Sequence, residues 1–222
     1  MKFRFVSLIA LPAKILKFCA PDDQSACFIA RVNRGVSVDN RLLPEADPLE
    51  QAQDVAKALA TAQEKVRSLG GDPRSFVLMG HSAGAHLVTL LSANPNMATH
   101  VCAQLWRGTV ALDSAAYDVA GIMSSPLPRL YDRAFGNDPA FWRRASPSAQ
   151  LLPAARPMLL VCSSTRRESC AQAEDFEARA RTVGVHAAVL PMAKSHFAIN
   201  EDLGKPGSYA AAVDRFAQRM VK

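Results

Sequence analysis

The chain has 222 residues, of which 49% are hydrophobic and 21% are charged. This composition excludes a disordered or fibrous protein and supplies enough apolar side chains for one sizeable core. The net charge is +6, with Lys and Arg scattered along the sequence, so we expect a solvated basic surface and no nucleic-acid partner. No apolar run approaches the roughly 20 residues of a membrane span, so we expect no stable membrane insertion.

The N-terminal segment permits two interpretations. A basic start precedes a mostly apolar run from Phe5 to Ala13, which is the order found in a short signal peptide. A buried first strand fits the same residues and is favoured, because Pro12 interrupts the run. We expect a single domain over residues 1–222, with residues 1–34 as an atypical N-terminal segment. Localisation stays open, with the cytoplasm slightly favoured over the periplasm or secretion.

Strand-like and helix-like segments alternate from about residue 35 onward. Short apolar runs predict buried strands, and apolar residues at three- and four-residue spacing predict helices. This alternation is typical of an α/β protein with a mostly parallel central sheet flanked by helices. The predicted strands are Gly35–Asp39, Phe76–Met79, Thr109–Leu112, Pro157–Cys162 and His186–Leu190, and the predicted helices after the first are Ala83–Ser92, Ala171–Val183 and Tyr209–Met220.

The first predicted helix has the clearest boundaries. Asp47 is a candidate N-cap, Pro48 occupies the first helical position, and Glu50 follows the cap by three residues. This pattern predicts a capping box with Asp in the capping role. Gly70 and Gly71 supply the stop signal.

Residues 115–155 form an irregular segment that contains five prolines. A segment without regular periodicity between two strands is a candidate cap or lid over a site.

The motif Gly80-His81-Ser82-Ala83-Gly84 joins a predicted strand to a predicted helix. This is the G-x-S-x-G pattern in the strand–turn–helix setting of a nucleophile elbow. Glycines are needed because the two backbones approach too closely for a Cβ, and the strained central residue projects its side chain above the sheet. Ser82 is therefore the predicted nucleophile, and the backbone N–H of Ala83 is the predicted oxyanion donor.

Several segments together resemble the α/β-hydrolase superfamily, and most of all its esterase/lipase and arylformamidase-like branch. The resemblance covers roughly residues 30–220 and implies the α/β-hydrolase fold, a Ser–acid–His triad and no metal or cofactor. Its segments are Asp39-Asn40-Arg41-Leu42-Leu43-Pro44-Glu45, Asp54-Val55, Gly70-Gly71-Asp72-Pro73, Met79 to Gly84, Leu112-Asp113-Ser114, Phe135-Gly136-Asn137-Asp138-Pro139 with Ser146-Pro147, and Ser195-His196.

The triad of this fold runs in the order Ser, acid, His. His196 is the last of five histidines and follows the final predicted strand, so it is the predicted general base. The family usually places an Asp after the strand at 157–162, but the loop there contains no Asp. Its only carboxylate is Glu168, which we predict to be the acid. Asp113, at the end of the preceding strand, is the alternative.

The five cysteines include one pair that is close in sequence, Cys162 and Cys170. A bridge between them would close one loop and would suit an oxidising compartment, whereas free thiols in a cytosolic protein are just as compatible. Such a bridge could also retract the backbone at Glu168 so that its longer side chain fits the acid's place. The sequence contains no Cys-x-x-Cys pair, which is the spacing that would indicate a metal site.

The source of the second oxyanion donor is not visible in the sequence. Relatives carry a His-Gly-Gly-type loop near the N-terminus, but no glycine precedes Gly35 here. The stretch Cys19–Cys27 would be the place for a replacement loop. The chain could be a minimal hydrolase, an altered or truncated member with weakened catalysis, or one whose N-terminal reading frame differs from that of its relatives.

The sequence thus predicts a serine hydrolase that cleaves small-molecule carboxylic esters through an acyl-enzyme. The alternatives are an arylformamidase-like amide hydrolase, a non-catalytic binding protein with the same fold, and a lipase with a lid near Ile122–Leu130. Oligomeric state, acyl specificity and alcohol specificity stay open.

Overall fold

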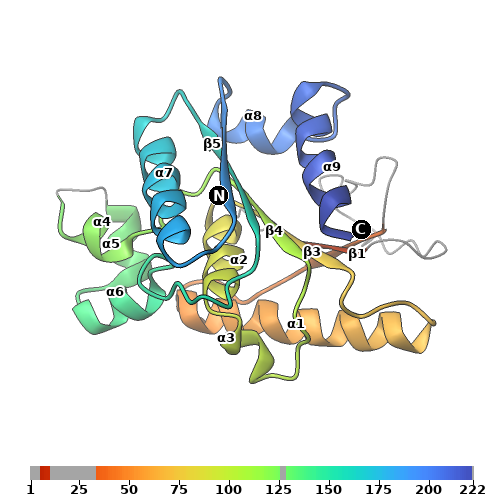
Figure 1. The fold of residues 1–222 in the computed structure, drawn as a ribbon. Helices are drawn as coiled ribbons and strands as arrows, with labels where there is room; N and C mark the ends of the chain where they lie inside the picture. Colours follow the sequence, from red (N-terminus) through yellow and green to blue (C-terminus); the bar gives the residue numbers. More distant parts are fainter. Residues whose placement is uncertain (1–5, 11–33, 126–128, 222) are drawn as a thin grey trace.

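The structure is a computed structural model that describes residues 6–10, 34–125 and 129–221. Its centre is a sheet with the strand order β2-β1-β3-β4-β5-β6 (Figure 1). Strands β3 to β6 pair in parallel, whereas β1 runs antiparallel to both of its neighbours. The predicted α/β class with a mostly parallel sheet is confirmed. The strands are β1 (Val6–Ala10), β2 (Arg34–Val38), β3 (Phe76–His81), β4 (Gly108–Leu112), β5 (Met158–Ser163) and β6 (Ala187–Met192).

Helices cover both faces of this sheet. Figure 1 shows α1, α2 and α7 on one side and α8 and α9 on the other. The segment predicted to be irregular contains the short helices α4, α5 and α6, which pack on one another. The helices are α1 (Pro48–Ser68), α2 (Ala83–Ala93), α3 (Asn96–Thr99), α4 (Val119–Met123), α5 (Arg129–Phe135), α6 (Pro139–Ala145), α7 (Arg167–Thr182), α8 (His196–Glu201) and α9 (Ser208–Val221).

The central strands are buried on both faces, which explains their continuous apolar sequences. On β3, Leu78 packs in a core with α1 and α2, whereas its neighbour Val77 packs in a core with α8 and α9. The same alternation holds on β5, where Leu160 faces α7 and Val161 faces α9. Rigid packing on two sides fixes the carboxyl ends of β3, β4 and β5 at one edge of the sheet.

Helix α1 begins as its sequence predicts. Asp47 accepts hydrogen bonds from the backbone N–H groups of Leu49 and Glu50 at 2.8 and 2.9 Å, and the Asp47 N–H donates to Glu50 at 2.9 Å. The capping box is therefore present. Arg41 anchors the preceding loop to α1 through a bidentate pair with Asp54, with both N–O distances 2.9 Å.

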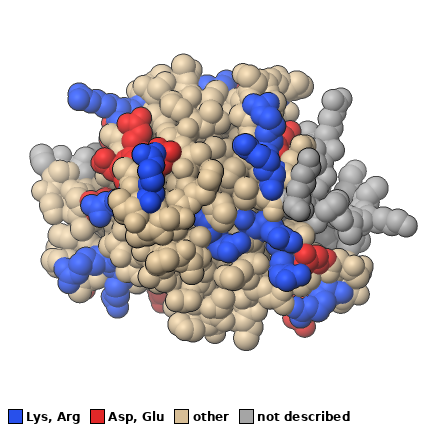
Figure 2. Space-filling view, viewed as in Figure 1, with Lys and Arg blue, Asp and Glu red and all other residues tan. Residues whose placement is uncertain are grey.

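The surface carries its charges in a dispersed pattern. On the face shown in Figure 2, Lys and Arg form several separate groups with Asp and Glu among them, as the scattered sequence positions predict. Among the helices of the described ranges, none combines the length and apolar character needed to cross a membrane.

Candidate active site

Ser82 lies in the sharp turn between β3 and α2. Its backbone angles are φ 57° and ψ −117°, a region that residues other than glycine rarely adopt. A Cβ on Gly80 would lie 2.3 Å from the carbonyl oxygen of Gly84, so the turn closes only around glycine. The N–H of Ser82 donates to the carbonyl of Leu112 at 2.9 Å, which ties the elbow to the end of β4.

Ala83 is the first residue of α2. The first N–H groups of a helix have no partner within the helix, and the helix dipole favours negative charge beside them. The Ser82 side chain does not cap α2. The position of Ala83 therefore suits the oxyanion role predicted for it, and that role stays a prediction.

His196, the first residue of α8, contacts a carboxylate that follows β4. Its Nδ1 lies 2.6 Å from Oδ2 of Asp113, whose side chain is completely buried. Asp113 has a positive φ of 54°, and its N–H donates to the carbonyl of Val161 at 2.7 Å. The turn after β4 thus holds Asp113 against the imidazole.

The structure contradicts the prediction that Glu168 orients His196. Helix α7 begins at Arg167, four residues earlier than its periodicity indicates, so Glu168 lies in a first helical turn and is exposed. Asp113, the alternative, occupies the place at Nδ1 instead. Two features of the sequence pointed to Asp113: no Asp follows β5, and Asp113 directly follows the preceding strand, β4.

Asp113 is held by several donors. Besides His196, it accepts hydrogen bonds from the N–H of Ser163 at 2.7 Å, from the Ser169 hydroxyl, and from Arg166 at 2.7 Å. Burial by itself would raise the pKa of Asp113, but these hydrogen bonds and the Arg166 charge outweigh burial and hold the pKa below its ordinary value. Asp113 is therefore ionised at neutral pH.

The loop that supplies three of those donors is closed by a disulfide. Cys162 lies in β5, Cys170 lies in α7, and their Cα atoms are 5.1 Å apart. The bridged alternative is therefore the one that the structure contains. Ser163, Arg166 and Ser169 all lie between the two cysteines, so the bridge restrains the surroundings of Asp113.

His81 has a role that the sequence did not reveal. Its Nε2 lies 2.9 Å from the carbonyl oxygen of His196, and the two rings are 4.4 Å apart between centroids. Burial, with a smaller contribution from the charge of His196, lowers the pKa of His81 to about 4. His81 is thus neutral, and its Nε2–H donates to the backbone of His196. This contact places the imidazole beside the elbow.

Strand β1, which neighbours the elbow strand β3, runs antiparallel to it. In β1, Val6 pairs with Gly80 and Ala10 pairs with Phe76, so the chain leaves β1 at the edge opposite Ser82. The stretch Cys19–Cys27, where a replacement loop was considered, lies outside the described residues.

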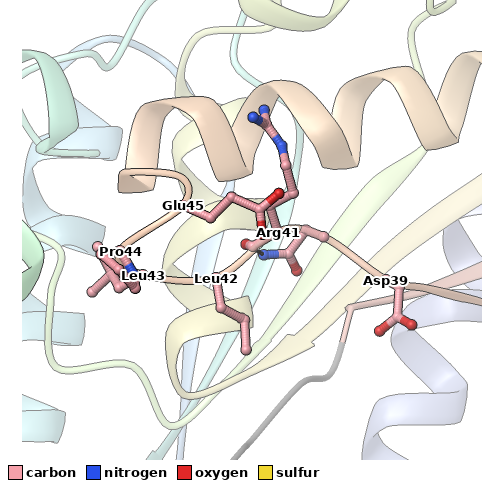
Figure 3. A pocket seen from close by; sticks show the side chains of 7 residues that line it. Asp39, Arg41, Leu42, Leu43, Pro44 and Glu45 are labelled. Atoms are coloured by element: carbon pink, nitrogen blue, oxygen red, sulfur yellow. Dashed lines mark hydrogen bonds between the residues drawn. The ribbon is translucent and has the colours of Figure 1, made fainter.

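An open pocket of about 490 Å³ lies at the carboxyl end of β2 and is lined by residues 39–45 (Figure 3). Val38 and Gly80 both pair with Val6, so the carboxyl ends of β2 and β3 lie at the same sheet edge, about 10 Å apart across two strand spacings. In Figure 3 the Arg41 side chain extends toward α1, where it pairs with Asp54.

A family model described as the carboxylesterase family matches residues 52–137, a range that includes Ser82 and Asp113. No curated protein matches the sequence. Solved structures do match. Carboxyl esterase 2 of the mycorrhizal fungus Tuber melanosporum is 20% identical, with a TM-score of 0.65 over 86% of this chain and 67% of that chain.

Two further structures are similar. Thermogutta terrifontis esterase 2 phosphonylated by sarin is 15% identical, with a TM-score of 0.68 over 85% of this chain and 73% of that chain. A truncated form of a carbohydrate esterase from gut microbiota is 16% identical, with a TM-score of 0.69 over 84% of this chain and 74% of that chain.

The fold is that of an α/β-hydrolase, as the sequence resemblance implied. Within it, the segment that the carboxylesterase family model matches carries both the elbow and Asp113. This match supports an esterase-type enzyme that hydrolyses esters.

Proposed function

We propose that this chain is a serine hydrolase that cleaves small-molecule carboxylic esters, with Ser82 as nucleophile, His196 as base and Asp113 as acid. The observation that carries the proposal is the 2.6 Å contact between the buried carboxylate of Asp113 and the partly exposed ring of His196, which lies against His81 of the strained Ser82 elbow. The carboxylesterase match over residues 52–137 supports an ester as the substrate. A triad is recognised by such geometry and not by sequence position.

The proposed reaction assigns one step to each of these groups. Ser82 Oγ attacks the carbonyl carbon while its proton passes to Nε2 of His196, and Asp113 stabilises the imidazolium through Nδ1. The Ala83 N–H donates to the oxyanion. The imidazolium then gives its proton to the departing alkoxide oxygen, which leaves an acyl-enzyme. Water, deprotonated by His196, attacks that ester and releases the acid.

A cap formed by α4, α5 and α6 is part of this proposal. These helices pack on one another around Phe135, and the His86 ring of α2 meets Phe135 edge-on at 5.5 Å. Burial raises the pKa of Tyr131 on α5, and the charges of Arg166, Glu168 and Asp113 act on the same hydroxyl. Helix α5 therefore lies near the charged residues around the proposed triad.

Ester turnover and covalent labelling test the proposal directly. Wild-type protein is expected to hydrolyse p-nitrophenyl acetate and to react with a fluorophosphonate probe, and Ser82→Ala is expected to do neither. The probe suits this fold, because Thermogutta terrifontis esterase 2 was solved phosphonylated by sarin. Folded wild-type protein that shows neither turnover nor labelling would instead indicate a non-catalytic binding protein.

A further inference from the structure

An arginine lies inside the proposed triad. Arg166 Nη1 is 2.7 Å from Oδ2 of Asp113 and 2.8 Å from Nδ1 of His196. Because Nδ1 is itself 2.6 Å from the same Oδ2, the three atoms form a closed triangle of contacts. Arg166 is the N-cap residue of α7, and its side chain is 28% exposed, so the contact is partly shielded from water.

The three contacts cannot all be hydrogen bonds at once. A guanidinium has only donors, and Nδ1 of a neutral imidazole carries either a proton or a lone pair. If Nδ1 carries the proton and donates to Asp113, then Arg166 and His196 present two donors to each other. If Nδ1 accepts from Arg166, the proton is on Nε2, where it prevents uptake of the Ser82 proton. Arg166 as a donor and Asp113 as an acceptor thus compete for Nδ1 of His196.

The positive charge of Arg166 also disfavours a proton on both nitrogens of the His196 ring. An imidazolium at His196 would carry a positive charge within 3 Å of the guanidinium, and like charges this close disfavour each other. The carboxylate of Asp113 must also share its negative charge between two cations. The protonated form of His196 is therefore less stable than it would be beside Asp113 alone.

The other groups around His196 do not supply this effect. His81 of β3, whose ring is tilted by 34° to that of His196, is neutral because it is buried. Lys194, which precedes α8, is paired with Asp202 at 2.6 Å. Tyr131 from α5 is neutral, because burial raises the pKa of its hydroxyl, and the charges of Arg166, Glu168 and Asp113 act on that hydroxyl.

We propose that Arg166 is a positioning residue that acts through Asp113 and His196 to keep the imidazole neutral at lower pH. The kinetic consequence rests on the proposed function: a general base must be unprotonated, so Arg166 extends ester hydrolysis toward acidic pH. The effect on the imidazole itself does not require that the protein is an esterase.

Titration of the His196 ring tests the proposal. Nitrogen-15 NMR would follow ring protonation in Ser82→Ala protein, with and without Arg166→Gln. We expect the midpoint to rise by about one pH unit when the charge is removed. Arg166→Lys, which keeps a cation, is expected to restore most of the wild-type midpoint. The matched control is Arg167→Gln, which removes an exposed charge one residue away and is expected to leave the midpoint in place.

The pH dependence of kcat/KM supplies the second readout. With Ser82 intact, Arg166→Gln is expected to move the acid limb to higher pH by the same amount as the ring titration. An unmoved midpoint would overturn the proposal. A rate that falls equally at every pH would also overturn it, because that result is expected of a merely structural role. Should Arg166→Gln fail to fold by circular dichroism, Arg166→Met removes the charge while keeping the apolar stem.

The two proposals fail in different ways. If wild-type protein does not hydrolyse esters, the proposed function is wrong, and the ring titration in Ser82→Ala still tests Arg166. If esters are hydrolysed and the midpoint does not respond to Arg166→Gln, the role of Arg166 is wrong and the proposed function stands.

Discussion

Asp113 shows how much of the site depends on a single buried group. Its two oxygens accept from the backbone of Ser163, the hydroxyl of Ser169, the guanidinium of Arg166 and the ring of His196. A buried charge is tolerated only when it is paired and hydrogen-bonded in this way. The carboxylate is thereby fixed in position and in charge, as stabilising an imidazolium requires.

Replacing Asp113 with Asn is expected to lower kcat by about three to four orders of magnitude, because an amide does not hold the imidazole in the required tautomer. Hydrolysis of p-nitrophenyl acetate measures the loss. Glu168→Gln is the matched control, and since Glu168 is exposed in α7, its rate should stay near that of wild type. A larger loss for Glu168→Gln than for Asp113→Asn would restore Glu168 as the acid.

The site residues that sequence reasoning proposed most directly are those with a local signal. Ser82 is marked by the two glycines of its turn, and His196 by its place after the last strand. The choice between Asp113 and Glu168 was not local. It depends on which loop meets the imidazole in space, and on a helix that begins at Arg167 although its apolar periodicity becomes clear only later.

At the scale of single elements, the elbow depends on Gly80. Gly80→Ala is expected to destabilise the fold by about 3 kcal/mol or more, because its Cβ would meet the backbone of Gly84, which cannot move without displacing α2. Urea unfolding measures the change. Gly70→Ala is the control, since its Cβ would meet nothing within 4 Å and only its left-handed backbone costs about 1–2 kcal/mol. Equal costs for both variants would contradict the crowding at Gly80.

The loop between β5 and α7 is a second element with a testable role. Replacing Cys162 and Cys170 with Ala together is expected to cost about 2–3 kcal/mol of stability. It should also lower kcat by about ten- to a hundredfold, because three donors to Asp113 lose their restraint. Thermal unfolding and ester turnover measure these effects. Cys102→Ser, at an exposed free cysteine, is the control. Unchanged kcat in the double variant would show that the loop keeps its position without the bridge.

Sequence patterns predicted long elements better than short ones. The capping box of α1 and the apolar runs of the central strands carry strong local signals, and each appears where expected. Helices α4, α5 and α6 are five to seven residues long, which is too short for a helical period to show. The antiparallel direction of β1 has no sequence signal, because either direction buries the same apolar residues.

The whole molecule should lose stability in mild acid. His81 and His86 are both buried, and burial lowers the pKa of each to about 4 from an ordinary value of 6.5. The unfolded chain therefore binds protons at a higher pH than the folded chain does. The resulting contribution to stability is fully present above about pH 6.5 and is lost as the pH falls toward 4.

Urea unfolding at a series of pH values tests this prediction. The free energy of unfolding is expected to fall by a few kcal/mol over that interval, and by less in His86→Asn, whose side-chain amide can replace the contact that Nδ1 makes with the carbonyl of Ala116 at 2.8 Å. His100→Asn removes an exposed histidine and is the control. A flat profile in wild-type protein would mean that neither buried ring resists protonation in the fold.

The position of Asp113 after β4 also has a meaning for how such a chain can change over generations. With Asp113 after β4 as the proposed acid, the loop after β5 does not need to supply one, and here it supplies the cation of Arg166. A single substitution in that loop, at a position nearer to His196 than the exposed Glu168, could introduce a carboxylate beside the imidazole before Asp113 is lost. The acid can therefore migrate from one strand to the next through an intermediate that carries both, without a lineage ever passing through a form that lacks it.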